Sequence, residues 1–296
     1  MMRKVILALI LLAMAGAATA EVRVAATVPN MGMLVEEIGG DAVDVTVMAP
    51  PDRDAHYLEA TPSMMAALRR ADMVVSVGAE LEVGWLPAAI QGANNPQVQT
   101  GRSGYFEAAN HIQMIEVGLA PDRAQGDIHP EGNPHFYMDP ERMAQVGHAL
   151  ANRLADFDSD NADTFRENAE DFEAAVEERV PEWQEMAEDA PGVVLFHKDI
   201  NYLMRLVDVP IHGYLEPLPG IPPTARHLQG LVDGLRDRDG VVMLTDFQPG
   251  EGARFVADEL GWDVAQYANQ VQPGDDRYDY FEMIDQWVEG AAIHRD

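Results

Sequence analysis

Residues 160–188 read DNADTFRENAEDFEAAVEERVPEWQEMAE and decide how the chain is organised. Large apolar side chains recur on one stripe of this polar segment, which is typical of an amphipathic helix. They are Phe165, Phe172, Val176 and Trp183. We expect Pro181 to kink or interrupt the helix, because proline removes a backbone hydrogen bond. About thirty helical residues span about 45 Å at 1.5 Å each, which is enough to connect two lobes.

Short β-like runs alternate with helical patterns on both sides of this segment. The expected strands are Val22–Ala26, Val43–Met48, Met73–Val77, Val193–Phe196, Val209–Leu215, Val241–Thr245 and Asp263–Tyr267. Residues 101–134 are rich in Gly, Pro and polar side chains, and we expect a long loop there. The alternation predicts an α/β fold of two parallel-sheet lobes, residues 21–157 and 191–296. One long helix, within 158–190, joins them, with a cleft between the lobes.

The composition limits the kinds of partner. Twenty basic side chains oppose fifty acidic ones, so the formal net charge is −30. This balance argues against nucleic acid as the main partner, because phosphate binding needs a basic face. Only two lysines occur, Lys4 and Lys198. Two explanations fit an acidic, lysine-poor chain: a salt-rich source, where self-repulsion is screened, and GC-rich codons that favour arginine.

The first twenty residues have the pattern of a secretory leader. Arg3 and Lys4 form a charged start, an apolar stretch follows, and Ala18-Thr19-Ala20 is an A-x-A cleavage site. We therefore expect residues 1–20 to be a signal peptide. The chain has no Cys, which excludes thiolate metal ligands and a lipid on an N-terminal Cys. We expect a soluble, monomeric, periplasmic protein.

Three of the nine histidines lie next to the ends of predicted elements. His56 lies in the loop after the second strand, His135 just before a helix, and His197 directly after a strand. Ligands of open α/β sheets bind beyond the carboxyl ends of the strands, so these side chains can meet between the lobes. Neutral imidazole suits Zn²⁺, whereas Mn²⁺ prefers more carboxylate. The three residues therefore predict a divalent metal site, with Zn²⁺ favoured over Mn²⁺.

The residues around these histidines resemble a known family, the solute-binding proteins of zinc and manganese ABC importers. The pieces that match its first three ligand motifs in order and spacing are Asp54…His56-Tyr57…Thr61-Pro62-Ser63, Asn133-Pro134-His135…Asp139-Pro140 and Phe196-His197. Residues 126–135 and 216–223 look like a subgroup of the zinc type. The resemblance implies two α/β lobes bridged by a long helix, with metal ligands at His56, His135 and His197.

The fourth ligand departs from the family pattern. The family usually supplies an Asp after a late strand, whereas this chain has Ala268-Asn269-Gln270 there. The remaining candidates, as fourth ligand or as outer partners of the ligands, are Glu216, Asp275, Asp276, Glu59, Asp139 and a water molecule. His129 is expected on the surface of the long loop, with contact to the metal as the alternative.

Three functions follow from these observations. The first is a periplasmic metal-binding component of an ABC importer, with an inner-membrane permease as its partner and no enzymatic activity. The second is a zinc-dependent hydrolase, because three histidines with one open position also describe a catalytic zinc. No H-E-x-x-H pattern or nucleophile motif accompanies them. The third is a binding protein for another solute, in which the histidines serve structure.

Overall fold

The computed structural model describes residues 21–118 and 129–293, so the predicted signal peptide lies outside the described residues. The N-terminal lobe contains a parallel sheet in the order β2-β1-β3-β4. Its strands are β1 (Val22–Ala26), β2 (Val43–Val47), β3 (Met73–Ser76) and β4 (Tyr105–Glu107). Its helices are α2 (Pro29–Gly39), α3 (Pro62–Arg70) and α4 (Leu86–Ala93). β1 and β3 are nearly all apolar and buried, as expected of strands covered on both faces.

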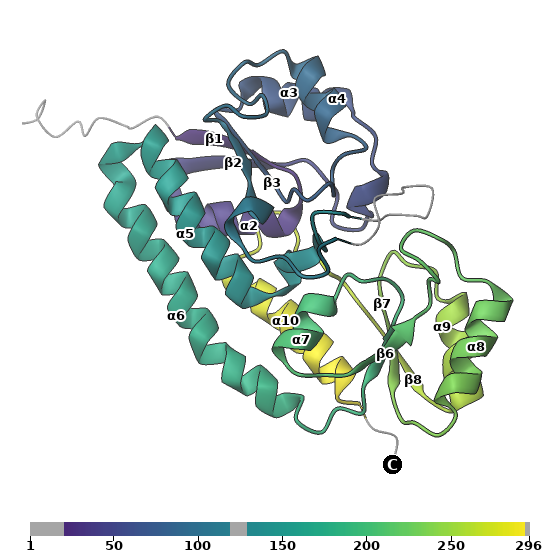
Figure 1. Cartoon of the computed structure of the whole chain (residues 1–296). Coiled ribbons are helices and arrows are strands. Elements are labelled where there is room, and N and C mark those ends of the chain that lie inside the picture. The colour runs from purple at the N-terminus through teal and green to yellow at the C-terminus, as the bar shows by residue number, and fades with distance from the viewer. Residues whose placement is uncertain (1–20, 119–128, 294–296) are drawn as a thin grey trace, which may run out of the picture.

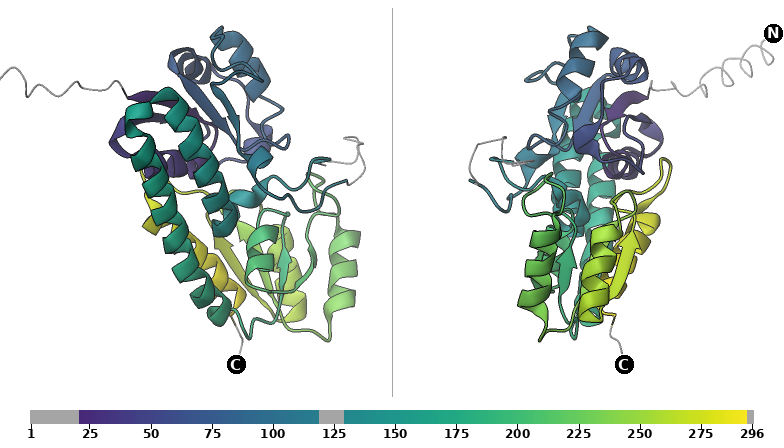
Figure 2. Two further views of the ribbon diagram at one scale, coloured as in Figure 1. Left: turned by 60° about the vertical axis from the view of Figure 1, so that its left-hand side comes forward. Right: turned by 90° about the vertical axis from the view of Figure 1, so that its right-hand side faces the viewer.

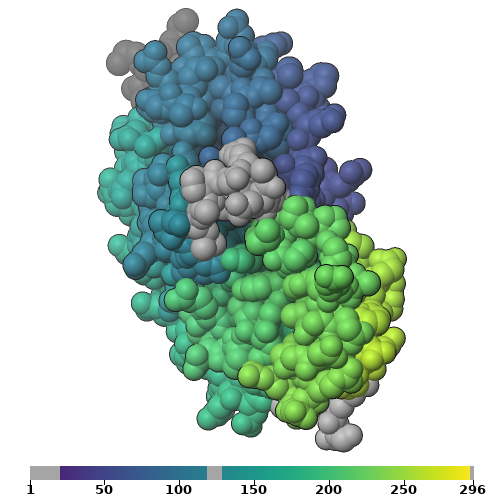
Figure 3. Space-filling model, turned by 45° about the vertical axis from the view of Figure 1, so that its right-hand side comes forward, coloured from purple at the N-terminus to yellow at the C-terminus, as the bar shows by residue number. Residues whose placement is uncertain are grey.

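The C-terminal lobe repeats this architecture, with a parallel sheet in the order β6-β5-β7-β8. Its strands are β5 (Val193–Leu195), β6 (Ile211–Tyr214), β7 (Val241–Thr245) and β8 (Asp263–Tyr267). Its helices are α7 (Asn201–Leu206), α8 (Ala225–Leu235), α9 (Glu251–Leu260) and α10 (Arg277–Ala291). Figure 3 shows the two lobes from outside, with blue N-terminal residues above green C-terminal ones. The prediction of two parallel α/β lobes is confirmed.

A pair of long helices runs along one side of both lobes (Figures 1 and 2). They are α5 (Pro140–Phe157) and α6 (Ala162–Met186). Asp139 begins α5, because its side chain accepts a hydrogen bond from the Arg142 backbone N–H at 3.1 Å. The predicted apolar stripe of α6 is buried, so this helix packs its apolar face against the lobes and keeps its acidic face in solvent.

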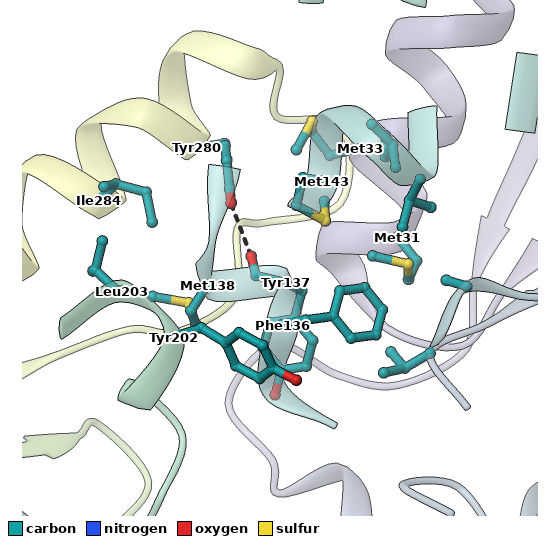
Figure 4. Close-up of a cluster of buried hydrophobic side chains, with 14 of the residues drawn as sticks. Met31, Met33, Phe136, Tyr137, Met138, Met143, Tyr202, Leu203, Tyr280 and Ile284 are labelled. Atoms are coloured by element: carbon teal, nitrogen blue, oxygen red, sulfur yellow. Dashed lines mark hydrogen bonds between the residues drawn. The ribbon is translucent and has the colours of Figure 1, made fainter. Parts of the chain in front are cut away.

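The apolar core continues from one lobe into the other. Figure 4 shows Met31 and Met33 of α2 beside Phe136 and Tyr137, with Tyr202 of α7 and Tyr280 of α10 on the other side. All of these side chains are at most 3% exposed and belong to one buried cluster. The Tyr280 hydroxyl donates a hydrogen bond to the Tyr137 carbonyl at 2.9 Å. The lobes therefore share their interior.

Two local expectations were wrong, and of the two effects expected of Pro181 the interruption does not occur. Residues 101–134 contain the edge strand β4, which is only three residues long and lies among Gly and polar residues that obscure its pattern. The apolar pattern of Leu81–Ile90 predicts a helix there, but α4 begins five residues later, because residues 78–80 have positive φ angles and turn the chain. Pro181 does not interrupt α6. Val180 and Trp183, on either side of it, are both buried, and their packing holds the helix.

Among residues 21–118 and 129–293, none of the helices combines the length and the hydropathy needed to cross a bilayer.

Trp183 is expected to contribute strongly to stability. It is fully buried, donates its indole N–H to Asp285 at 2.6 Å and packs edge-on against Phe281. Trp183→Ala should lower the free energy of unfolding by about 3–5 kcal/mol, as measured by urea denaturation. Phe255→Ala, which removes a 36% exposed ring from α9, is the control. A loss from Trp183→Ala no larger than the loss from this control would contradict the prediction.

Candidate metal centre

His56 is held by the residue two positions before it. A single 3₁₀ turn, Ala55–Tyr57, follows β2 and the loop after it. The Asp54 carboxylate accepts hydrogen bonds from the His56 backbone N–H at 2.9 Å and from its ring Nδ1 at 2.7 Å. A carboxylate can only accept, so Nδ1 carries the proton and Nε2 is the nitrogen left to face a metal ion. Asp54 thus sets both the orientation and the tautomer of this ring.

His135 has the same arrangement with an amide in place of the carboxylate. It begins a second 3₁₀ turn, His135–Met138, and is buried. The Asn133 Oδ1 atom accepts from the His135 backbone N–H at 3.0 Å and from Nδ1 at 2.8 Å. The Asn133 amide donates to the Lys198 carbonyl of the other lobe at 3.0 Å. His135 is therefore anchored across the boundary between the lobes.

His197 comes from the C-terminal lobe, two residues after β5 ends. Its Nδ1 donates to the Glu216 carboxylate at 2.7 Å, and this carboxylate also accepts from the Gly220 N–H at 3.0 Å. His197 is 9% exposed. Glu216, a candidate fourth ligand in the sequence analysis, therefore lies behind His197, where it orients the ring.

The structure brings the three histidines together. Each offers one ligand atom, and these atoms all lie within 4.8 Å of one another. The ring centroids are 5.2 Å apart for His56 and His135, 5.2 Å for His135 and His197, and 5.7 Å for His56 and His197. Because every Nδ1 is engaged by an acceptor, Nε2 is the nitrogen left for coordination. The donor set fits one tetrahedral cation of the Zn²⁺ kind.

Two further side chains, those of His129 and Asp199, lie next to the three histidines. His129 has its Nε2 atom 3.1 Å from that of His56. Asp199 is buried, and its Oδ1 lies 3.4 Å from the His135 Nε2, while Gln248 donates to its Oδ2 at 2.7 Å. The one signal for Asp199 was its place two residues after His197. His129 was expected on the surface and is instead half-buried against His56.

The other candidate carboxylates are engaged elsewhere. Asp139 caps α5 and pairs with Arg142. Asp276 caps α10, accepting from the backbone N–H groups of the next helical turn. The Asp275 carboxylate accepts from the Gln272 N–H at 2.7 Å. Glu59 is exposed. None of these four belongs to the group of converging ligand atoms found in the described part of the chain.

Burial and charge set the protonation of the rings. Burial, and then the neighbouring imidazoles, lower the pKa of His135 well below its ordinary 6.5, so this ring is neutral at pH 7. Burial opposes protonation of His197 as well, yet Asp199, Glu216 and Asp54 together raise its pKa to about 9. Burial raises the pKa of Asp199. The carboxylates therefore favour a positive charge among the rings.

A narrow pocket beside the rings is lined by both lobes. Its walls include His56 and His135 together with Asp199, Phe247 and Gln270. The three histidines therefore lie beside a pocket that both lobes line.

Comparisons with known proteins identify the family. The model of one family, the periplasmic component A of zinc-uptake complexes (ZnuA), matches residues 24–291. The chain belongs to this family. One curated relative of the chain is the metal ABC transporter substrate-binding lipoprotein SsaB of Streptococcus sanguinis. It is 22% identical over 225 residues, which are 74% of this chain and 70% of SsaB.

Two other similar proteins extend the comparison. The iron ABC transporter substrate-binding lipoprotein MtsA of Streptococcus pyogenes is 22% identical over 237 residues, or 72% of this chain and 73% of MtsA. A crystal structure of ZnuA superposes with a TM-score of 0.74 at 22% identity, covering 92% of this chain and 98% of that one. At this identity the structural likeness establishes the fold, and the prediction of the family is confirmed by the family match.

Glu216 is expected to strengthen metal binding through His197. Glu216→Gln keeps the size of the side chain and removes its charge, so zinc affinity should fall about 10–100-fold, the usual range for outer partners of a ligand. Competition with a chromophoric chelator measures the change. Glu259→Gln, an exposed position on α9 in the same lobe, is the matched control. Equal affinities for the two variants would contradict the role of Glu216.

Proposed function

We propose that this chain is the solute-binding component of an ABC importer and that its cargo is Zn²⁺. One observation carries the proposal: three imidazoles from two lobes, each with its Nδ1 held by an acceptor, direct Nε2 toward one another. His56, His135 and His197 would bind the ion. Family membership supports the importer role, since SsaB and MtsA are substrate-binding lipoproteins of metal transporters by name.

The choice of zinc rests on ligand chemistry. Imidazole nitrogen suits Zn²⁺, whereas Mn²⁺ prefers carboxylate and water oxygen. The three ligands proposed here are all nitrogen, and two of the nearby carboxylates, Asp54 and Glu216, face the far side of the rings. They would stabilise the charge of the ion without contacting it. Mn²⁺ should therefore bind more weakly than Zn²⁺.

The cellular setting follows from the same proposal. The leader-like residues 1–20 and the family support a periplasmic protein that works as a monomer and hands its ion to a membrane permease. A hydrolytic role for the bound zinc was the alternative. The family match favours binding over catalysis, and zinc-loaded protein should not turn over generic ester, phosphate or lactam substrates.

Metal titration tests the proposal. Metal-free protein should bind one Zn²⁺ per chain in calorimetry, with tight affinity in the presence of a competing chelator. Protein mixed with equimolar Zn²⁺ and Mn²⁺, then desalted, should retain zinc when its metal content is measured. Retention of manganese would overturn the choice of zinc, and retention of neither metal would overturn the metal-binding function itself.

A further inference from the structure

His129 is fixed on the same principle as the three proposed ligands. Its Nδ1 lies 2.9 Å from the Ala79 carbonyl oxygen. A carbonyl can only accept, so Nδ1 carries the proton and Nε2 is the nitrogen turned away from this acceptor. That Nε2 atom lies 3.1 Å from the Nε2 atom of His56, whose proton is likewise on Nδ1.

The Ala79 carbonyl that accepts from His129 lies in a segment with strained backbone angles. Gly78, Ala79 and Glu80 have φ angles of 85°, 46° and 66°. Two consecutive non-glycine residues in this region cost about 1 kcal/mol or more each, and such strain persists where the surroundings enforce it. Here the buried Glu82 carboxylate accepts from the Val77 and Gly78 N–H groups at 2.8 and 3.1 Å. These two hydrogen bonds to Glu82 therefore fix the turn that presents the Ala79 carbonyl to His129.

The Nε2 atoms of His56 and His129 face each other at 3.1 Å, where a shared proton forms a hydrogen bond, and a slightly wider spacing would let a metal ion take the place of that proton. Two lone pairs that face each other at 3.1 Å repel unless a proton or a metal ion lies between them. Two nitrogens on one tetrahedral Zn²⁺ with bonds of 2.0–2.1 Å are about 3.3–3.4 Å apart. Building on the proposed zinc function, we propose that His129 is the fourth ligand, completing an all-imidazole site with His56, His135 and His197.

His129 joins this group through His56. Its ring centroid is 5.1 Å from that of His56 and 6.5 Å from that of His135. Full coordination therefore requires its ring to move toward His135 when the ion binds.

Charge favours His129 over Asp199, the other side chain at bonding range. Asp54 and Glu216 already face two of the ligand rings, and their two negative charges balance a divalent cation. Asp199, 3.4 Å from the His135 Nε2, already places a third negative charge beside the rings, so it can stabilise the ion without bonding to it. A neutral imidazole adds a bond without adding charge.

The segment that would usually supply the fourth ligand is used for another purpose. The Asn30 side chain of α2 donates to the Asn269 carbonyl at 3.0 Å, and the Asn30 N–H donates to Gln270 Oε1 at 3.0 Å. The Asn30 Oδ1 also accepts from the Val271 N–H at 2.9 Å. Residues 269–271 thus join the lobes, and the fourth ligand comes from His129.

Counting the coordinated rings tests the inference. Long-range ¹H–¹⁵N spectra of the zinc-loaded protein should show four histidines with metal-bound Nε2. His129→Ala should lower zinc affinity more than about 100-fold, beyond the range for outer partners. His148→Ala, which removes a surface ring paired with Glu173, should leave affinity unchanged. Circular dichroism verifies that the variants fold.

Two results would overturn the inference. One is a zinc-loaded spectrum with three metal-bound rings. The other is an affinity that survives His129→Ala but is lost in Asp199→Asn, which would assign the fourth position to the carboxylate. Failure of the proposed function would look different, because the wild-type protein itself would then bind no zinc.

Discussion

Replacing His197 by alanine is expected to abolish tight zinc binding while the protein stays folded. His197 is the proposed ligand that the C-terminal lobe contributes. Without it, no nitrogen from that lobe reaches the ion. Loss of a directly bound imidazole should exceed the roughly 10–100-fold loss that follows removal of an outer partner. Calorimetry with and without a competing chelator gives the affinity.

The control for this variant is His148→Ala, since His148 lies on α5 and pairs with Glu173 at the surface. Its zinc affinity should equal that of the wild type. An unchanged affinity in His197→Ala would remove His197 from the ligand set. Urea denaturation of both metal-free variants separates a lost ligand from a lost fold.

Zinc is expected to stabilise the folded protein by a large margin. An ion that binds the folded state alone adds about 4 kcal/mol to the free energy of unfolding when its free concentration is a thousand times Kd. For a chain of this size that corresponds to a rise in Tm of roughly 8–16 °C. Thermal unfolding followed by circular dichroism, with zinc and then with excess chelator, measures the effect.

The stabilisation should depend on the histidines between the lobes. His197→Ala should unfold at the same temperature with and without zinc, whereas Trp183→Ala should start lower and gain the full increment. The effects of zinc and of the Trp183 substitution on Tm are expected to add, because Trp183 packs against Phe281 and Asp285, which are neither proposed ligands nor partners of the ligands. A zinc-induced rise in the His197→Ala variant would show that zinc stabilises the protein from another place.

Local patterns were sufficient to predict most of the fold. β1, β7 and β8 have the predicted bounds, because short apolar runs are strong local signals. β4 lacks such a signal, since three residues carry no periodicity and its pairing with β3 is what makes it a strand. The continuity of α6 past Pro181 likewise depends on packing, which the sequence does not display.

Part of the candidate site could likewise be predicted from the sequence, and part of it could not. Sequence motifs placed His56, His135 and His197 at the ends of elements, and the topology of two parallel sheets brings such ends together. The contacts of His129 with Ala79 and His56 join residues 50 and 73 positions apart. No spacing rule relates these positions, so this part of the site could be recognised only in three dimensions. Glu216 was identified as a candidate, and its place behind His197 again came from the structure.

The interior shared by the two lobes has a consequence for how quickly an ion is exchanged. A wide hinge motion would bring Met31, Tyr137 and Tyr280 into water, at a cost of about 25 cal/mol for each Å² of apolar surface. Exposed side chains at the rim, such as Tyr57 at 61% exposure, can shift without that cost. The residence time of the cargo would then be governed by the rearrangement of a few side chains, while the outer dimensions of the molecule stay nearly constant.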